Sequence, residues 1–186
     1  MKLISLLEKL EYTCLQGSTD QEVKNVIYDS RKVEEGSLFI CIRGAVVDGH
    51  KFVPDVVAKG AKVLIVEEDV TVILVKDTRY AMAFISAAYF GYPAEKLKTI
   101  GITGTKGKTT TTYMVKSILE NAGYKVGLIG TIEAIIGDKV IPAKNTTPES
   151  YVIQEYFHEM AEAGCDCVVM EVSSQGLMLH RTQGFV

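Results

Sequence analysis

Apolar residues recur along this chain in two alternating patterns, short runs typical of β-strands and longer stretches typical of α-helices. The first twelve residues place four leucines (Leu3, Leu6, Leu7 and Leu10) on one face, which predicts an amphipathic helix. Up to residue 92, the pattern then predicts strands over 23–28, 38–42, 62–66 and 70–75 and helices over 53–59 and 78–89.

A cluster of helix and strand breakers, Gly91-Tyr92-Pro93, separates this half from a more regular second half. We therefore expect two domains, residues 1–92 and residues 93–186. The second half predicts strands over 99–103, 126–129 and 167–172, helices over 109–122, 148–163 and within 175–180, and a hairpin over 134–141. Because strands and helices alternate, the expected fold class is α/β, with a small N-terminal α/β domain followed by a parallel-sheet domain.

Composition and charge narrow the possible functions. Apolar residues make up 47% of the chain and charged residues 23%, which excludes a disordered or collagen-like protein. The net charge is −3, and neither half has the surplus of Lys and Arg that nucleic-acid binding requires. No apolar run approaches the roughly 20 residues of a membrane span, and the first residues lack the features of a signal peptide. We expect a cytoplasmic protein with no nucleic-acid or membrane partner.

The cysteines fit a reducing compartment. Cys165 and Cys167 alternate at the start of an apolar strand, so we interpret them as buried thiols. A metal site at this pair would need a second pair of ligands, which the sequence does not offer.

The most informative stretch is 99–112, where an apolar strand leads into a Gly-rich turn and then a helix. Gly104 and Gly107 allow the backbone to curl so that successive N–H groups face inward, and the helix adds its partial positive charge. Lys108 follows at the position that reaches the β- and γ-phosphates of a nucleotide, and the Thr109 hydroxyl can bind Mg²⁺. The full pattern G-x-x-x-x-G-K-[ST] would need Gly where Ile102 stands, so only the shorter form is present. A helix start that is merely rich in Thr and Gly is the alternative.

A second metal ligand is expected at the end of a neighbouring strand. Glu171 follows the apolar run 167–170, which places its carboxylate at the carboxyl edge of the sheet, where phosphate loops also lie. The alternative is a strand-end Glu that faces water.

Further motifs occur on both sides of the loop. Asn145-Thr-Thr-Pro148 and Glu171-Val-Ser-Ser174, with His180-Arg181, follow it, and Asp29-Ser-Arg31, Gly36-Ser-Leu-Phe39 and Asp48-Gly-His50 precede it. In this order, and together with Thr103-Gly-Thr-Lys-Gly-Lys-Thr-Thr110, they resemble the Mur ligases, which build the peptide of bacterial cell-wall precursors. The resemblance is strongest to MurE, the branch that adds the third residue, and it extends over essentially the whole chain.

The resemblance implies an N-terminal UDP-sugar-binding domain and a partial ATP-binding central domain. It implies an ATP-dependent amide ligase of peptidoglycan synthesis, in which ATP phosphorylates the D-Glu side chain of UDP-MurNAc-L-Ala-D-Glu. The amine of a diamino acid, meso-diaminopimelate or L-lysine, then attacks the acyl phosphate. ATP and Mg²⁺ are the implied cofactors, Lys108 the catalytic residue, and Thr109 and Glu171 the metal ligands. The implied ATP-binding residues are Gly104, Thr105, Lys106, Gly107, Lys108, Thr109 and Thr110.

The resemblance also implies two groups of substrate-binding residues. Tyr28, Ser30, Ala45, Val46 and Val47 correspond to positions that contact the UDP part. The sugar–peptide part corresponds to Asn145, Thr146, Thr147, Ser173 and Arg181. Local alternatives exist: Asp29-Ser30-Arg31 as a turn, Thr147 as a helix cap, His50 as a surface loop residue and His158 as a solvated helix residue.

The central domain expected from the resemblance is longer than the chain, and the domain that selects the amino acid is not represented. We therefore expect a truncated ligase that does not catalyse ligation alone and has no diamino acid site. Three alternatives stay open: MurF, the ligase that adds the terminal dipeptide; a non-catalytic nucleotide-binding remnant; and a simple P-loop ATPase or GTPase. Asn145-Thr-Thr-Pro148 disfavours MurF, and Asp29-Ser30-Arg31 has no role in a simple ATPase or GTPase.

Overall fold

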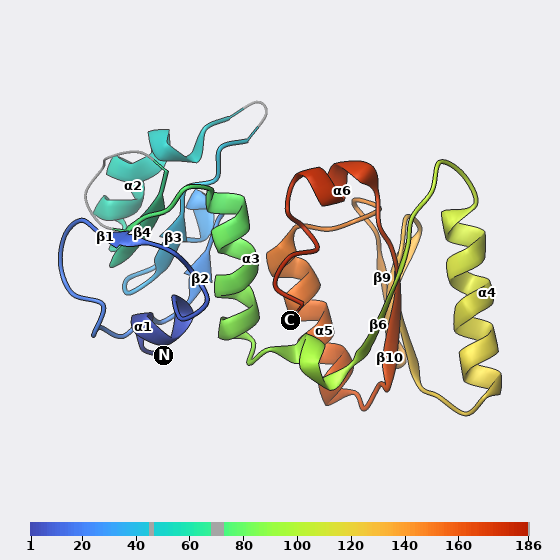
Figure 1. Ribbon diagram of the computed structural model, residues 1–186. Helices are drawn as coiled ribbons and strands as arrows, with labels where there is room; N and C mark the ends of the chain where they lie inside the picture. Colours follow the sequence, from blue (N-terminus) through green and yellow to red (C-terminus); the bar gives the residue numbers. More distant parts are fainter. Residues whose placement is uncertain (45–46, 68–72, 186) are drawn as a thin grey trace. The chain divides into compact units, whose positions relative to one another are not determined.

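The computed structural model describes residues 1–44, 47–67 and 73–185, and the chain divides into two compact units, Met1–Tyr89 and Phe90–Val186 (Figure 1). The sequence had placed the division between Tyr92 and Pro93. Each unit contains one five-stranded sheet covered by helices, so the predicted α/β class is confirmed. Both units are described separately below.

The first unit is built on a mostly parallel sheet with the strand order β1-β5-β4-β3-β2. Its strands β2 to β5 pair in parallel, and only β1 joins β5 in the antiparallel sense. The strands are β1 (Thr13–Cys14), β2 (Val26–Ile27), β3 (Leu38–Ile40), β4 (Val63–Val66) and β5 (Ile73–Leu74). The helices are α1 (Leu3–Leu6), α2 (Val53–Ala58) and α3 (Thr78–Tyr89), with short 3₁₀ turns η1 (Ser30–Lys32) and η2 (Gly49–Phe52).

Continuous apolar runs in β3 and β4 follow from burial on both faces of this sheet. Phe39 and Leu64 pack with Val56 of α2 in one cluster. Because side chains alternate along a strand, the neighbouring Leu38 and Val63 point to the opposite face, toward α3.

The second unit combines a parallel centre with an antiparallel edge. Its strand order is β6-β10-β7-β8-β9, in which β10 pairs in parallel with both β6 and β7, while β7, β8 and β9 are antiparallel. The predicted hairpin is confirmed, with Gly137 at φ +58° in its turn. The strands are β6 (Lys98–Ile102), β7 (Val126–Ile129), β8 (Glu133–Ile136), β9 (Lys139–Pro142) and β10 (Cys167–Glu171). The helices are α4 (Lys108–Asn121), α5 (Ser150–Glu162), α6 (Ser174–Met178) and the 3₁₀ turn η3 (Pro93–Lys96).

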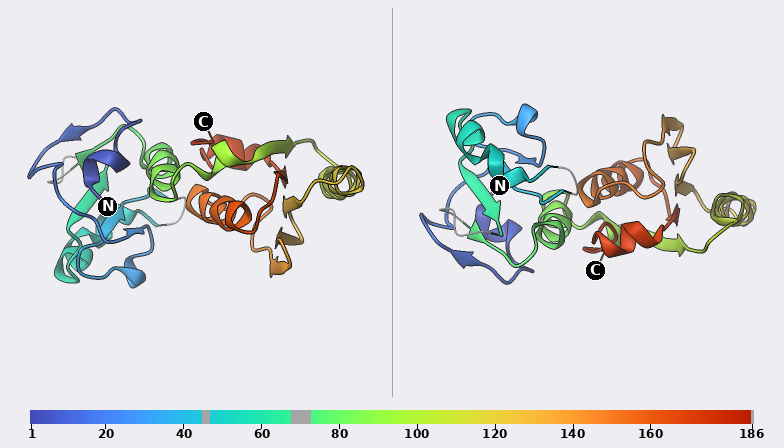
Figure 2. Two further views of the ribbon diagram at one scale, coloured as in Figure 1. Left: turned by 90° about the horizontal axis from the view of Figure 1, so that it is seen from below. Right: turned by 90° about the horizontal axis from the view of Figure 1, so that it is seen from above.

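Helices α4 and α5 cover opposite faces of this second sheet, as Figures 1 and 2 show. Val168 and Met170 of β10 pack with Phe157 of α5, whereas Val169 packs toward Leu119 of α4. The alternation along β10 assigns the next residue, Glu171, to the α4 face. This places a carboxylate on the side of the sheet where the Gly-rich loop enters α4.

The first twelve residues depart from the sequence prediction. Helix α1 is a single turn, although Leu3, Leu6 and Leu7 are buried as the amphipathic pattern requires. Strand β1 was not predicted, because two residues carry no readable periodicity. Among the cysteines, Cys165 and Cys167 are buried as expected, and the described residues hold no cluster suited to a metal ion. None of the helices in the described part has the length and apolar character needed to cross a membrane.

We predict that Phe157→Ala lowers the free energy of unfolding by about 3–5 kcal/mol, because the ring is fully buried in the larger core of the second unit. Met114→Ala, at a side chain 60% exposed on α4, should change it by less than about 0.5 kcal/mol. Urea unfolding followed by circular dichroism measures both. Equal effects of the two substitutions would contradict the packing described.

Candidate functional site

The carboxyl ends of three adjacent parallel strands meet at one edge of the second sheet. Strand β6 leads into the loop 103–107, β10 ends at Glu171, and β7 is followed by Gly130 and Thr131. The register sets Glu171 beside Ile102 of β6 and, one residue earlier, Met170 beside Ile129 of β7. This is the edge at which parallel α/β sheets bind ligands.

The loop after β6 has the backbone curl that its glycines predict. Gly104 and Gly107 have φ values of +152° and +78°, a region that favours glycine, and Gly107 caps α4. Lys108 Nζ donates a hydrogen bond of 2.8 Å to Gly104 O, so the ammonium lies over the loop. Residues 103–107 are exposed. The loop therefore presents a lysine and the N-terminus of a fourteen-residue helix to solvent.

Glu171 is fully buried and receives three hydrogen bonds. The Thr109 hydroxyl donates to Oε2 at 3.1 Å, the Thr131 hydroxyl to Oε2 at 3.0 Å, and the Thr131 N–H to Oε1 at 2.9 Å. A strand-end Glu facing water is therefore wrong for this residue. The sequence did not identify Thr131, although its position directly after β7 was a usable signal.

The donor set at Thr109 and Glu171 fits a divalent cation. A hydroxyl oxygen and a carboxylate oxygen 3.1 Å apart, at the start of a helix that follows a phosphate-type loop, are ligands that Mg²⁺ accepts beside nucleotide phosphates. Thr110 follows in the first turn of α4 and is exposed. The residues present thus suit both Mg²⁺ and the phosphates of a nucleotide.

Thr147 connects the segment before α5 to the end of β10. Its hydroxyl donates to Glu171 O at 3.0 Å and accepts from Ser173 N at 3.0 Å, with the Ser173 hydroxyl 3.3 Å away. The interpretation of Thr147 as a helix cap is wrong, since the cap of α5 is Glu149. Thr146 lies next to it and contacts the Thr131 hydroxyl at 3.1 Å, whereas Asn145 is exposed.

Arg181 holds the same segment from the other side. Its guanidinium donates to Thr147 O at 2.9 Å and to Glu149 Oε1 at 2.7 Å, and both side chains are largely buried. Arg181 Nε is buried and has no hydrogen-bond partner among the described residues. The structure thus brings Thr146, Thr147, Ser173 and Arg181 into one group beside Glu171.

The predicted UDP-binding residues all belong to the first unit. Ser30 opens η1 and Tyr28 precedes it, both half-buried, and Lys59 Nζ donates to Ser30 O at 3.0 Å. Val47 is 51% exposed, whereas Ala45 and Val46 lie outside the described residues. The neighbouring Asp29 caps η1 and pairs with Arg31, which confirms a locally satisfied turn.

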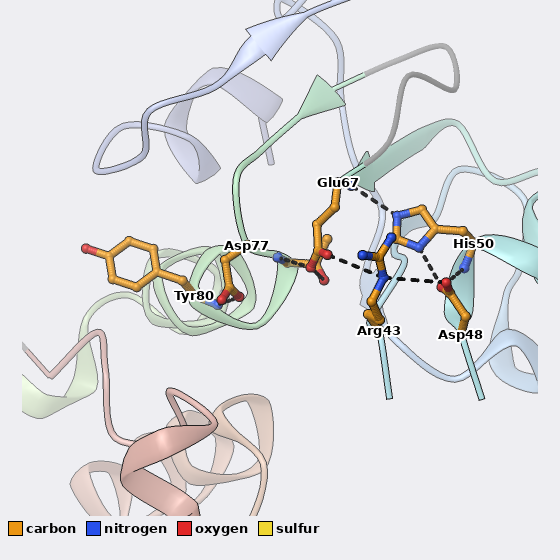
Figure 3. A network of polar contacts seen from close by, with 7 residues as sticks. Arg43, Asp48, His50, Glu67, Asp77 and Tyr80 are labelled. Carbon is orange, nitrogen blue, oxygen red and sulfur yellow. Dashed lines mark hydrogen bonds and ion pairs between the residues drawn. The ribbon is translucent and has the colours of Figure 1, made fainter. Parts of the chain in front are cut away.

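A polar network follows the predicted UDP-binding segment in the first unit (Figure 3). His50 Nδ1 lies 2.6 Å from Asp48 Oδ1, and its Nε2 accepts from Glu67 N at 3.0 Å, so the proton resides on Nδ1. Hydrogen bonds from the His50 backbone and ring lower the pKa of Asp48. The interpretation of His50 as a surface loop residue is wrong, since its side chain is only 7% exposed.

Other polar groups of this network tie separate elements together. Glu67 Oε1 accepts hydrogen bonds from the N–H and the hydroxyl of Thr78 at the start of α3, at 2.8 and 2.6 Å. Arg43 Nε lies 3.5 Å from Asp48 and 3.8 Å from Glu67. In the second unit, His158 is half-buried beside the ring of Phe90 and is not fully solvated, as had been expected.

Comparisons with known protein families match nearly all of the chain. Residues 22–98 match the family described as Mur ligase family, catalytic domain, and residues 102–186 match the Mur ligase middle domain. The two matches leave a gap of only three residues, at η3 and β6, where the described units also separate in sequence.

Individual relatives point the same way. The UDP-N-acetylmuramoyl-L-alanyl-D-glutamate–2,6-diaminopimelate ligase of Clostridium perfringens is 52% identical over 99% of this chain, which spans 39% of that relative. A solved structure with the same enzyme name has a TM-score of 0.79 at 24% identity, over 99% of this chain and 38% of its own. MurF from Acinetobacter baumannii has a TM-score of 0.59 at 27% identity, over 93% and 36%.

We predict that Arg31→Ala raises the pKa of Asp29, which is held at about 2 against its ordinary 3.8 by the side-chain and backbone hydrogen bonds from Arg31. The rise should be partial, because the Arg31 N–H still donates. Since the folded-state pKa is lowered, these bonds stabilise the turn above about pH 4 and are lost as the pH falls toward 2. Carboxyl ¹³C NMR measures the titration, and Lys32→Ala, the weakest contributor, is the control.

Proposed function

Because this chain belongs to the Mur ligase family, with its N-terminal and middle domains, we propose that it supplies the UDP-sugar and ATP sites of a MurE-type ligase. The chain spans about two fifths of the length of the relatives that it matches, so the complete ligation is part of this proposal. The product would be an amide between a diamino acid and the D-Glu carboxylate of UDP-MurNAc-L-Ala-D-Glu. The relatives' names favour diaminopimelate over lysine.

One observation carries the proposal: the Lys108 loop and the Thr109–Glu171 pair converge at the carboxyl edge of the sheet. ATP, when bound with Mg²⁺, supplies the phosphoryl group that turns a poor electrophile into an acyl phosphate. Lys108 leaves Gly104 O and neutralises charge on the β- and γ-phosphates. Thr109 and Glu171 hold the cation, and the N–H groups of Gly104 to Thr110 bind phosphate oxygens.

The substrate is assigned to the group around Thr147. Asn145, Thr146 and Ser173 offer hydroxyl and amide groups for the sugar and peptide, and Arg181 offers charge for a carboxylate or phosphate. Tyr28, Ser30 and 45–47 would hold the uridine diphosphate. A reaction that uses a nucleotide-linked sugar and ATP also fits a cytoplasmic protein.

The relatives' names separate the proposal from its main alternative. The relative that is 52% identical is a diaminopimelate ligase, whereas the MurF likeness is a weaker structural one. A calorimetric comparison of UDP-MurNAc dipeptide with UDP-MurNAc tripeptide tests the assignment. Preference for the dipeptide supports a MurE-type site, and preference for the tripeptide would overturn it.

We predict that Lys108→Ala weakens ATP binding about tenfold to a hundredfold, because a hydrogen bond to a charged group contributes roughly 1.5–3 kcal/mol. Lys96→Ala removes an equal charge from η3, where the side chain is exposed, and should leave the affinity unchanged. Isothermal titration calorimetry with a non-hydrolysable ATP analogue and Mg²⁺ measures both. Unchanged binding by Lys108→Ala would refute the phosphate-loop assignment.

A further inference from the structure

Thr131 is the only residue of the described site that contacts both oxygens of Glu171. Its N–H donates to Oε1 at 2.9 Å and its hydroxyl to Oε2 at 3.0 Å. We propose that Thr131 is a positioning residue of the metal–nucleotide site, which orients the Glu171 carboxylate and links it to the substrate loop at Thr146. This inference rests on the proposed function and adds a residue to it.

Glu171 needs such support when a cation is bound. In the described state the Thr109 hydroxyl spends its single proton on Glu171 Oε2, at 3.1 Å. Thr109 and Glu171 together can hold a cation only through their oxygen lone pairs, so this hydrogen bond is given up on binding. The two bonds from Thr131 do not involve Thr109 and are retained. They keep the plane of the carboxylate in place while its third donor turns away.

The backbone at Gly130 makes this contact possible. A Cβ at Gly130 would lie 2.8 Å from Glu171 Oε1, which is closer than such atoms come in proteins. The chain therefore approaches the carboxylate at a glycine, and the next N–H, that of Thr131, reaches Oε1. The close approach explains why the residue before Thr131 carries no side chain.

The hydroxyl of Thr131 also has a defined direction. Its one proton goes to Glu171, so the 3.1 Å contact with Thr146 has Thr146 as the donor. The resulting chain of hydrogen bonds runs from Thr146 to Thr131 to Glu171. A residue proposed to bind the sugar–peptide part is thereby joined to a residue proposed to bind the cation.

The test measures nucleotide affinity with and without the cation. The whole chain is titrated calorimetrically with a non-hydrolysable ATP analogue, once with Mg²⁺ and once with EDTA. Thr131→Val keeps the N–H and the shape but removes the hydroxyl, and Thr131→Ser restores the hydroxyl. Thr99→Val, at an exposed threonine of β6, controls for loss of a hydroxyl elsewhere in the same unit.

We expect Thr131→Val to lose about tenfold in affinity with Mg²⁺ and to match the unchanged chain in EDTA. Thr131→Ser and Thr99→Val should bind as the unchanged chain does in both conditions. Because the Thr131 side chain is exposed, its replacement should leave the thermal unfolding midpoint unchanged. A merely structural role would instead lower affinity in both conditions.

A double-substitution cycle links the effect to Glu171. In a Glu171→Gln background, Thr131→Val should add less than about twofold, because the carboxylate it positions is gone. Additive effects, or full Mg²⁺-dependent affinity in Thr131→Val, would overturn the inference and leave the nucleotide site standing. Failure of the unchanged chain to bind the nucleotide with Mg²⁺ would overturn the proposed function and this inference together.

Discussion

A carboxylate with no access to water has to be surrounded by hydrogen-bond donors, and Glu171 imposes this requirement on the second unit. Burying an unpaired charge costs several kcal/mol, so the donors are part of the fold and not an addition to it. They come from the helix after β6 and from the turn after β7, the two strands that flank β10. The parallel arrangement of these strands is what brings the donors to one edge.

Much of this arrangement follows from local sequence. The runs 126–129 and 167–172 and the Gly-rich turn before α4 are strong signals, because each combines an apolar run with a breaker or a helix start. Glu171 could be placed at the sheet edge for the same reason. Family resemblance added Thr146, Thr147 and Arg181 as a group, and the structure finds these side chains close together.

Other features depend on contacts between residues far apart in sequence and leave no local trace. His50 looked like a loop residue, yet its ring is enclosed because Glu67, on the far side of α2, donates its N–H to it. Thr147 precedes a proline and so resembles a cap, but its hydroxyl is used by Ser173 and Glu171 instead. Two-residue strands such as β1 are too short for any periodicity to show.

The order of strands in the second sheet has a consequence for how the unit folds. Strand β10 lies between β6 and β7 but is the last of the five in the chain, so β6 and β7 cannot complete their pairing until residues 167–171 are available. Loop closure over such separations slows folding, which makes insertion of this central strand the late event of assembly. The same insertion carries Glu171 to its donors. Maturation of the sheet and creation of the anionic centre are therefore a single step, and a ribosome-bound chain ending before β10 would expose the β6 and β7 edges with neither one formed.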